Sequence, residues 1–115
     1  MILSEKQSLF ALNAAKLILW ISEQPGYRVT LNEAYRTKEQ AAIYASQGKG
    51  ISASLHCIRL AIDLNLYKDG EYLSRSEEYK IMGDYWKSLH PDNKWGGDFK
   101  SHDGCHFSMG HEGRA

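Results

Sequence analysis

The chain has 115 residues, of which 43% are hydrophobic and 24% are charged, with 14 basic and 14 acidic side chains. This length fits one domain with a modest hydrophobic core, so we expect residues 1–115 to form a single domain. The balanced charge provides no global field to attract nucleic acid or an anionic membrane. It therefore argues against nucleases and cationic membrane-disrupting proteins, and we expect no nucleic-acid partner.

The start of the chain, MILSEK, lacks a basic region followed by a continuous apolar run. We therefore expect no signal peptide and synthesis in the cytoplasm. No stretch approaches the roughly 18 apolar residues that a membrane-spanning helix needs, so we expect no stable membrane insertion.

Cys57 and Cys105 are the two cysteines of the chain. Two cysteines are too few to indicate a disulfide scaffold. We favour two small buried residues over a disulfide or a thiolate metal ligand.

The first fifty residues carry the patterns of a helix, a strand and a second helix. Ser4 and Gln7 have the spacing of a capping box, and a broad apolar face follows until Pro25 ends the helix. Alternating apolar residues predict a strand over 27–35. Thr37 then opens a second helix that ends at a pair of nearby glycines.

The clearest strand is predicted over residues 58–66, where apolar and polar residues alternate. This alternation places Asp63 on the polar face of the strand. Asp69 and Gly70 then give a strong hairpin signal.

The remaining residues carry the patterns of a helix and a final short strand. Ser74 and Glu77 are spaced to cap a third helix, which His90 and the proline after it end. The last strand is predicted over 106–108. This order of elements predicts an α+β domain with a small antiparallel sheet flanked by helices.

Two histidines and an aspartate suggest a metal site. Two neutral imidazoles and one carboxylate are typical ligands of a hydrolytic Zn²⁺ that keeps a fourth position open. We interpret His56, Asp63 and His106 as the ligands of one Zn²⁺ ion, with His102 as the most credible substitute ligand. Asp103, three residues before the last ligand, is placed where a general acid/base would lie.

The spacing of His56 and Asp63 makes a geometric prediction. They are an odd number of residues apart, so one regular strand would place them on opposite faces. We therefore expect either a bend between them or His56 in the loop before the strand. The same argument applies to Asp103 and His106, where Gly104 supplies freedom to turn.

Four further residues each leave two or more interpretations open. Arg36 either stabilises an oxyanion, holds a substrate carboxylate, or forms an ordinary surface salt bridge. Ser54 binds substrate, orients the His56 loop, or is simply a turn residue. Trp95 walls the cleft or lies in the core, and Asp98 holds a ligand imidazole or shapes its turn.

Several motifs taken together resemble a known family. They are Ser54-x-His56 running to Ala61-x-Asp63, WGGDF at 95–99, Asp103-x-x-His106-Phe107, YRTKEQ at 35–40 and IYASQG at 43–48. Over roughly residues 27–109 the set resembles the zinc D,D-peptidases of the VanX/VanY type. It is most similar to the phage-endolysin branch, the L-alanyl-D-glutamate endopeptidases that cut the stem peptides of peptidoglycan.

The resemblance implies a zinc metallopeptidase with the three ligands named above and Asp103 as the base. It also implies that Arg36 steadies the transition state, that Ser54 helps bind substrate, and that the fold is shared with hedgehog signalling domains. The expected partner is a peptidoglycan stem peptide, reached after release during phage lysis, and we expect a monomer. The alternatives are a D-alanyl-D-alanine carboxypeptidase, a non-catalytic zinc-containing binding domain, and a metal-dependent nuclease.

Two positions depart from the family pattern. Arg59 stands where the family often has glycine, and we expect its long cation to narrow the cleft or to bind a substrate carboxylate. The base is Asp103, where the D,D-dipeptidase members carry glutamate, which fits the endolysin branch better.

Overall fold

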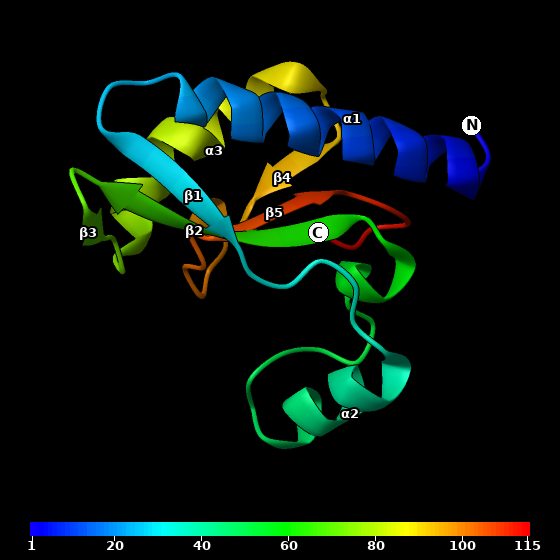
Figure 1. The fold of residues 1–115 in the computed structure, drawn as a ribbon. Coiled ribbons are helices and arrows are strands. Elements are labelled where there is room, and N and C mark those ends of the chain that lie inside the picture. The colour runs from blue at the N-terminus through cyan, green and yellow to red at the C-terminus, as the bar shows by residue number, and fades with distance from the viewer.

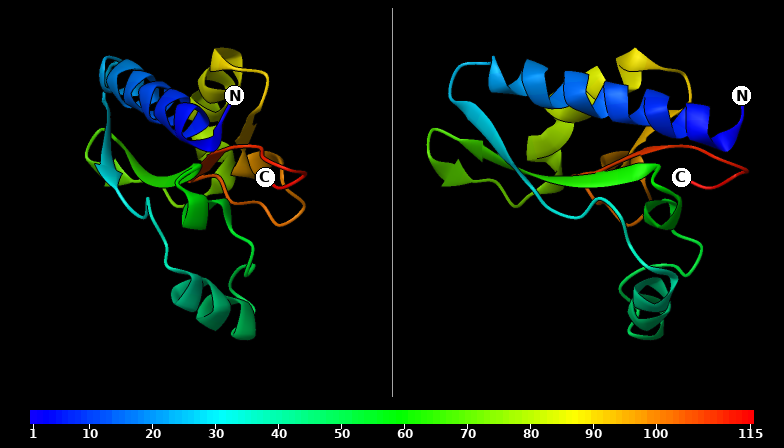
Figure 2. Two further views of the ribbon diagram at one scale, coloured as in Figure 1. Left: turned by 90° about the vertical axis from the view of Figure 1, so that its right-hand side faces the viewer. Right: turned by 45° about the vertical axis from the view of Figure 1, so that its right-hand side comes forward.

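The structure is a computed structural model that describes all 115 residues, Met1–Ala115, as an α+β fold (Figure 1). In chain order its helices and strands are α1 (Leu3–Ser22), β1 (Tyr27–Leu31), α2 (Lys38–Ser46), β2 (Ala61–Lys68), β3 (Glu71–Tyr72), α3 (Lys80–Leu89), β4 (Asn93–Trp95) and β5 (His106–Met109). Three short 3₁₀ helices connect them: η1 (Leu55–Ile58), η2 (Ser76–Tyr79) and η3 (Gly96–Asp98). The helices α1 and α3 lie together on one side of the sheet, and α2 stands off on the other side (Figures 1 and 2).

The sheet is antiparallel throughout, in the order β1-β2-β5-β4, with β3 paired to β2. The register of the central pair places Asp63 of β2 directly opposite His106 of β5. Residues that lie opposite each other in an antiparallel pair point to the same face. Two of the three predicted metal ligands therefore share one face of the sheet.

The other face of the sheet is sealed by helices. Leu64 and Leu66 are fully buried on that face, as the alternation of the strand predicts. The Trp86 ring of α3 lies edge-on to Phe10 of α1 and to Phe107 of β5, with centroids 5.5 and 6.1 Å away. Because this layer is filled with apolar side chains, the polar residues of β2 and β5 are left on the opposite side.

The predicted start of the central strand is wrong. The chain was expected to be extended from residue 58, but β2 begins at Ala61 because residues 55–58 wind into η1. Arg59 then has a φ of +59°, which turns the chain sharply before it enters the sheet. The expected bend between His56 and Asp63 is therefore confirmed, and it lies before the strand.

The predicted cap of the first helix is wrong as well. The helix begins at Leu3, and the Glu5 carboxylate accepts a hydrogen bond of 3.0 Å from the backbone N–H of Ile2. This places the cap two residues before the predicted Ser4. None of the helices combines the length and the apolar character that crossing a bilayer requires.

The third predicted helix divides into two parts, η2 and α3. Its cap is not made by Ser74 and Glu77: the Glu78 carboxylate accepts a hydrogen bond of 3.0 Å from the backbone N–H of Arg75. The short strand β4 was not predicted, since three residues are too few to show an alternating pattern.

Two other local predictions are confirmed. The Thr37 hydroxyl accepts a hydrogen bond of 3.1 Å from the backbone N–H of Gln40 and so caps α2. Asp69 and Gly70 both have positive φ, at 51° and 85°, as a two-residue hairpin between β2 and β3 requires.

The strand predicted over 27–35 ends earlier, at Leu31, and an irregular segment follows.

The Tyr79 hydroxyl joins η2 to the edge of β2. It accepts a hydrogen bond of 3.0 Å from the backbone N–H of Leu66 and donates one of 2.8 Å to the carbonyl of Leu73. Burial raises the pKa of Tyr79 to about 12, so the hydroxyl keeps the proton that it donates.

We predict that Tyr79→Phe lowers the free energy of unfolding by about 1–3 kcal/mol, because it leaves the buried Leu66 N–H without a partner. Urea denaturation measures this loss. Tyr85→Phe is the control, since the Tyr85 hydroxyl makes no hydrogen bond and its ring stack on Trp20 is kept. Equal stability of the two variants would contradict the prediction.

Candidate active site

A cleft of about 620 Å³ opens on the polar face of the β2–β5 pair. Its walls come from the segment before α2, the loop after α2, η1, β2 and the residues around the start of β5. The cleft brings together all six side chains singled out in the sequence: Arg36, Ser54, His56, Asp63, Asp103 and His106.

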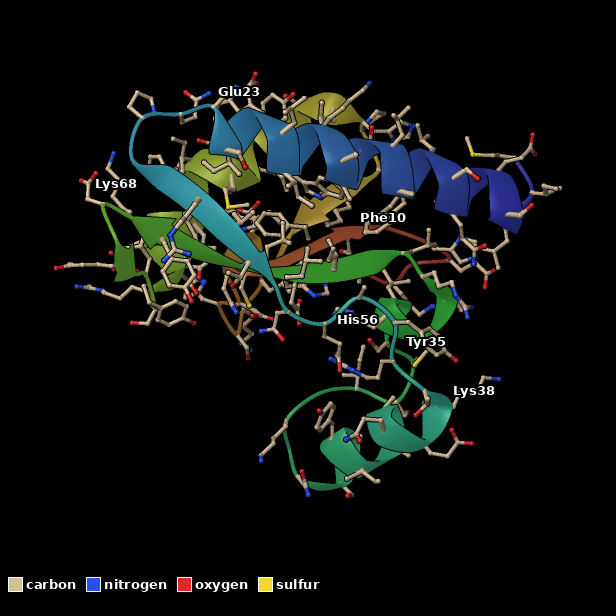
Figure 3. All side chains as sticks on the ribbon, in the orientation of Figure 1. Phe10, Glu23, Tyr35, Lys38, His56 and Lys68 are labelled. Carbon is tan, nitrogen blue, oxygen red and sulfur yellow. The ribbon has the colours of Figure 1, made fainter.

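His56 enters the cleft from η1 rather than from a strand. The Ser54 hydroxyl accepts a hydrogen bond of 3.1 Å from the His56 backbone N–H, which caps this short helix. The His56 side chain is 2% exposed, and its Nδ1 lies 2.9 Å from the carbonyl oxygen of Ala34. Figure 3 places His56 in the part of the chain between the sheet and α2.

Asp63 lies between the two imidazoles. Its Oδ1 is 3.3 Å from His56 Nε2 and 3.2 Å from His106 Nδ1. The His106 ring lies edge-on to the His56 ring, with centroids 5.2 Å apart. One carboxylate oxygen and two ring nitrogens thus converge on one point.

These residues fit a zinc ion. The three donor atoms all lie within 4.8 Å of one another, and they are of the types that Zn²⁺ prefers. The contact between His56 Nδ1 and the Ala34 carbonyl favours the proton on Nδ1, which leaves the Nε2 lone pair directed at the site. His106 has its polar neighbour, Asp63, at Nδ1. Its other ring nitrogen, Nε2, is buried and has no hydrogen-bond partner.

The electrostatics of the three residues are coupled. Burial alone would lower the pKa of His56, but the hydrogen bond and negative charge of Asp63 outweigh it and raise that pKa above 6.5. Burial alone would raise the pKa of Asp63, but hydrogen bonds from His106 and His56 lower it to about 2. Asp63 is therefore a carboxylate at neutral pH, and a divalent cation would take the place of a proton between the rings.

Asp103 lies in the loop between η3 and β5. Its backbone N–H donates a hydrogen bond of 2.9 Å to the carbonyl of Gly96, and its own carbonyl accepts one of 3.1 Å from the His106 N–H. A Cβ at Gly104 would lie 2.7 Å from the backbone of Ser76. Gly104 is therefore required by close packing rather than by the freedom to turn that we expected.

Arg36 and Ser54 are in contact at the side of the cleft. Arg36 Nη1 lies 3.3 Å from Ser54 Oγ, and the rest of the guanidinium binds the Glu33 carboxylate, with Nε at 2.6 Å. The Arg36 side chain is 13% exposed. Arg36 does form a salt bridge, but a largely buried one that holds its guanidinium in the cleft wall.

Several alternative roles are excluded by the structure. Trp95 lies in the core, where its Nε1 donates to the carbonyl of Gly104 at 2.8 Å. Asp98 binds Lys87 at 2.7 Å and does not hold a ligand imidazole. His102 lines the cleft, but it is exposed and is not one of the converging donors.

Arg59 lies outside the cleft, contrary to the expectation that it narrows the cleft or binds substrate there. It lines a separate apolar groove along α1, and its guanidinium stacks over the ring of Tyr35 at 4.2 Å. Figure 3 labels Tyr35 beside the chain that leads into α2.

The cysteines do not form a disulfide. Both are half-buried rather than fully buried. Burial, together with the negative charges of Asp103 and Asp63, raises the pKa of Cys105 to about 12. Neither cysteine is among the three converging donors, which agrees with leaving the thiols out of the metal site.

Sequence reasoning missed Glu33 and Ala34. Ala34 acts through its backbone carbonyl, which no side-chain pattern reveals. Glu33 stands three residues before Arg36, and opposite charges at this spacing were the available signal for their ion pair.

A family model described as D-alanyl-D-alanine carboxypeptidase, from peptidase family M15, matches residues 47–109, more than half of the chain. The chain belongs to this peptidase family. The match includes all three converging donors and Asp103. The His56, Asp63 and His106 group of this M15 metallopeptidase is consistent with a zinc site.

Solved structures share the fold. The Serratia marcescens L-Ala D-Glu endopeptidase ChiX has a TM-score of 0.66 and 17% identity, over 84% of this chain and 79% of that one. The vancomycin resistance D,D-pentapeptidase VanY from the VanB-type cassette, a variant in complex with Zn(II), has a TM-score of 0.58 and 17% identity, over 87% and 70%. No curated protein sequence matches the chain.

We predict that His56→Ala weakens zinc binding by at least about 100-fold, because it removes one of three protein ligands. Titration of metal-free protein with zinc against a competing chelator measures the affinity. His102→Ala is the matched control, since it removes a histidine from the same cleft without touching the donor group. An equal loss in both variants would count against the assigned ligands.

Proposed function

We propose that this M15 peptidase uses one Zn²⁺ ion to hydrolyse an amide bond in peptidoglycan stem peptides, as an L-alanyl-D-glutamate endopeptidase. The observation that carries the proposal is the convergence of His56, Asp63 and His106 in a cleft that Asp103 also lines. The motifs that resemble the endolysin branch, and the fold shared with an L-Ala D-Glu endopeptidase, support the choice of bond.

A Zn²⁺ ion in this site would polarise the substrate carbonyl and acidify a water molecule. His56 and His106 supply neutral imidazole nitrogens, and Asp63 supplies the one negative charge of the ligand set. The Ala34 carbonyl keeps the His56 ring in the orientation that ligation needs.

Asp103 and Arg36 carry the remaining steps. Asp103 accepts a proton from the attacking water and then delivers it to the leaving nitrogen. Arg36, held by Glu33, donates hydrogen bonds to the oxygen on which negative charge develops. Ser54 fixes both the Arg36 guanidinium and the His56 backbone, and its hydroxyl is available to the substrate.

A second candidate is a D-alanyl-D-alanine carboxypeptidase acting on the same stem peptides. The description of the matching family model favours it. The two reactions break different amide bonds with the same site residues, so the products distinguish them. The likeness of the motifs to phage endolysins supports our further proposal that the protein acts on the cell wall during phage lysis.

We predict that Asp103→Ala keeps its zinc and loses about 10²–10⁴-fold in turnover, the usual contribution of a general acid/base. Zinc content and hydrolysis of purified peptidoglycan are measured on the same preparation. Asp98→Ala is the control, because Asp98 is a nearby aspartate whose carboxylate binds Lys87. Full activity of Asp103→Ala would exclude Asp103 as the base.

Mass spectrometry of the soluble products identifies the bond that is cut. New amino ends at D-glutamate support the endopeptidase, and released D-alanine supports the carboxypeptidase. A zinc-loaded wild-type protein that yields neither product contradicts both proposals.

A further inference from the structure

We propose that Cys105 is a positioning residue for the proposed base: its thiol donates a hydrogen bond to the Asp103 carboxylate and holds that carboxylate ready for proton transfer. This inference rests on the proposed function, because it assigns Cys105 a role through Asp103. It concerns a residue that is neither a metal ligand nor part of the cleft lining.

The thiol and the carboxylate lie within hydrogen-bonding distance of each other. Cys105 Sγ lies 3.4 Å from Asp103 Oδ1. No other hydrogen bond or ion pair reaches the Asp103 carboxylate, although its side chain is exposed. An exposed aspartate with no partner would exchange among its staggered rotamers, so the hydrogen bond from the thiol is the restraint on this side chain.

The backbone around the pair is already fixed. The Asp103 N–H binds the Gly96 carbonyl at 2.9 Å, and the Gly104 N–H binds the Ser76 hydroxyl at 3.0 Å. The Cys105 carbonyl accepts a hydrogen bond of 3.0 Å from the Leu64 N–H of β2. Rotation of the Asp103 side chain is therefore the remaining freedom in the base, and the thiol opposes it.

The thiol can act as a fixed donor because Cys105 packs against the hydrophobic core. A protonated thiol has one proton to give, and the Asp103 carboxylate is the acceptor within reach. Engaging Oδ1 in this way leaves Oδ2 without a partner and free to accept a proton from water. Cys105 thus orients the Asp103 carboxylate through Oδ1 and leaves Oδ2 to act as the proton acceptor.

Cys57 provides an internal control. It also neighbours a proposed ligand histidine and is also half-buried. Its Sγ lies 3.8 Å from the carbonyl oxygen of Thr37, and it makes no hydrogen bond to a proposed catalytic side chain. Removing either thiol changes a similar volume, but only the Cys105 thiol donates a hydrogen bond to the proposed base.

The kinetic test compares Cys105→Ala, Cys105→Ser and Cys57→Ala in zinc-loaded enzyme. We expect Cys105→Ala to lower kcat about 5–10-fold, the effect of one hydrogen bond, while KM changes less than about 2-fold. Cys105→Ser keeps a donor, so its kcat should return to within about 3-fold of the wild type. Cys57→Ala should behave as the wild type, and all variants should retain zinc.

The hydrogen bond is also measured directly by the infrared S–H stretching band, in a Cys57→Ala background where one thiol remains. Hydrogen bonding lowers this frequency, so Asp103→Ala should raise it, whereas Asp98→Ala should leave it unchanged. This measurement needs neither zinc nor substrate and does not alter Cys105, so it holds even if Cys105→Ala fails to fold.

Two results would overturn the inference: equal kcat in Cys105→Ala and Cys57→Ala, or a thiol band that Asp103→Ala does not move. Absence of hydrolysis by the wild type contradicts the proposed function instead, and the infrared band then tests the contact by itself.

Discussion

The pairing of β2 with β5 sets the geometry on which the site depends. Asp63 and His106 face each other across this pair, so one register places the carboxylate and one imidazole 3.2 Å apart. A slip of one residue would turn one of them to the opposite face. The register is secured on the other side of the sheet, where Phe107 lies opposite Ile62 and packs against the Trp86 ring. The hydrophobic core thus fixes the relative position of two polar side chains that are 43 residues apart in sequence.

The third donor comes from outside the sheet, and backbone hydrogen bonds bring it into place. The segment after β1 continues alongside β2, where the Asp63 N–H donates to the Glu33 carbonyl at 2.8 Å. Two later residues of that segment hold η1: the Ala34 carbonyl contacts the His56 ring, and the Arg36 N–H donates to the His56 carbonyl at 3.2 Å. One irregular stretch of chain therefore positions a metal ligand and presents the guanidinium of Arg36 to the same cleft. Side chains on rigid, mutually bonded segments are the arrangement that a hydrolytic site needs.

The site was easier to predict from the sequence than the ends of the elements. The residues that converge are of uncommon types in a specific spacing, so their chemistry was visible before their positions were known. The start of β2 was missed because Ile58 and Leu60 continue the apolar alternation, although the first ends a 3₁₀ helix and Arg59 turns the chain between them. An arginine gives no signal of its own for a positive φ, since glycine or asparagine is the usual residue there. The glycine that the family often has at this position was the available signal, and we interpreted the change to arginine as an effect on the cleft instead. The Arg59 side chain consequently points to Tyr35 rather than to the cleft where we had expected it.

The central claim is that two imidazoles and one carboxylate of this chain bind a single zinc ion. X-ray absorption spectroscopy of zinc-loaded protein tests it most directly, because the spectrum distinguishes nitrogen and oxygen ligands from sulfur. We expect one zinc per chain, the scattering of two imidazole ligands, and only nitrogen and oxygen neighbours at about 2.0–2.2 Å. Sulfur at about 2.3 Å would show that a cysteine binds the metal. That result, or a protein that retains no zinc, would contradict the account.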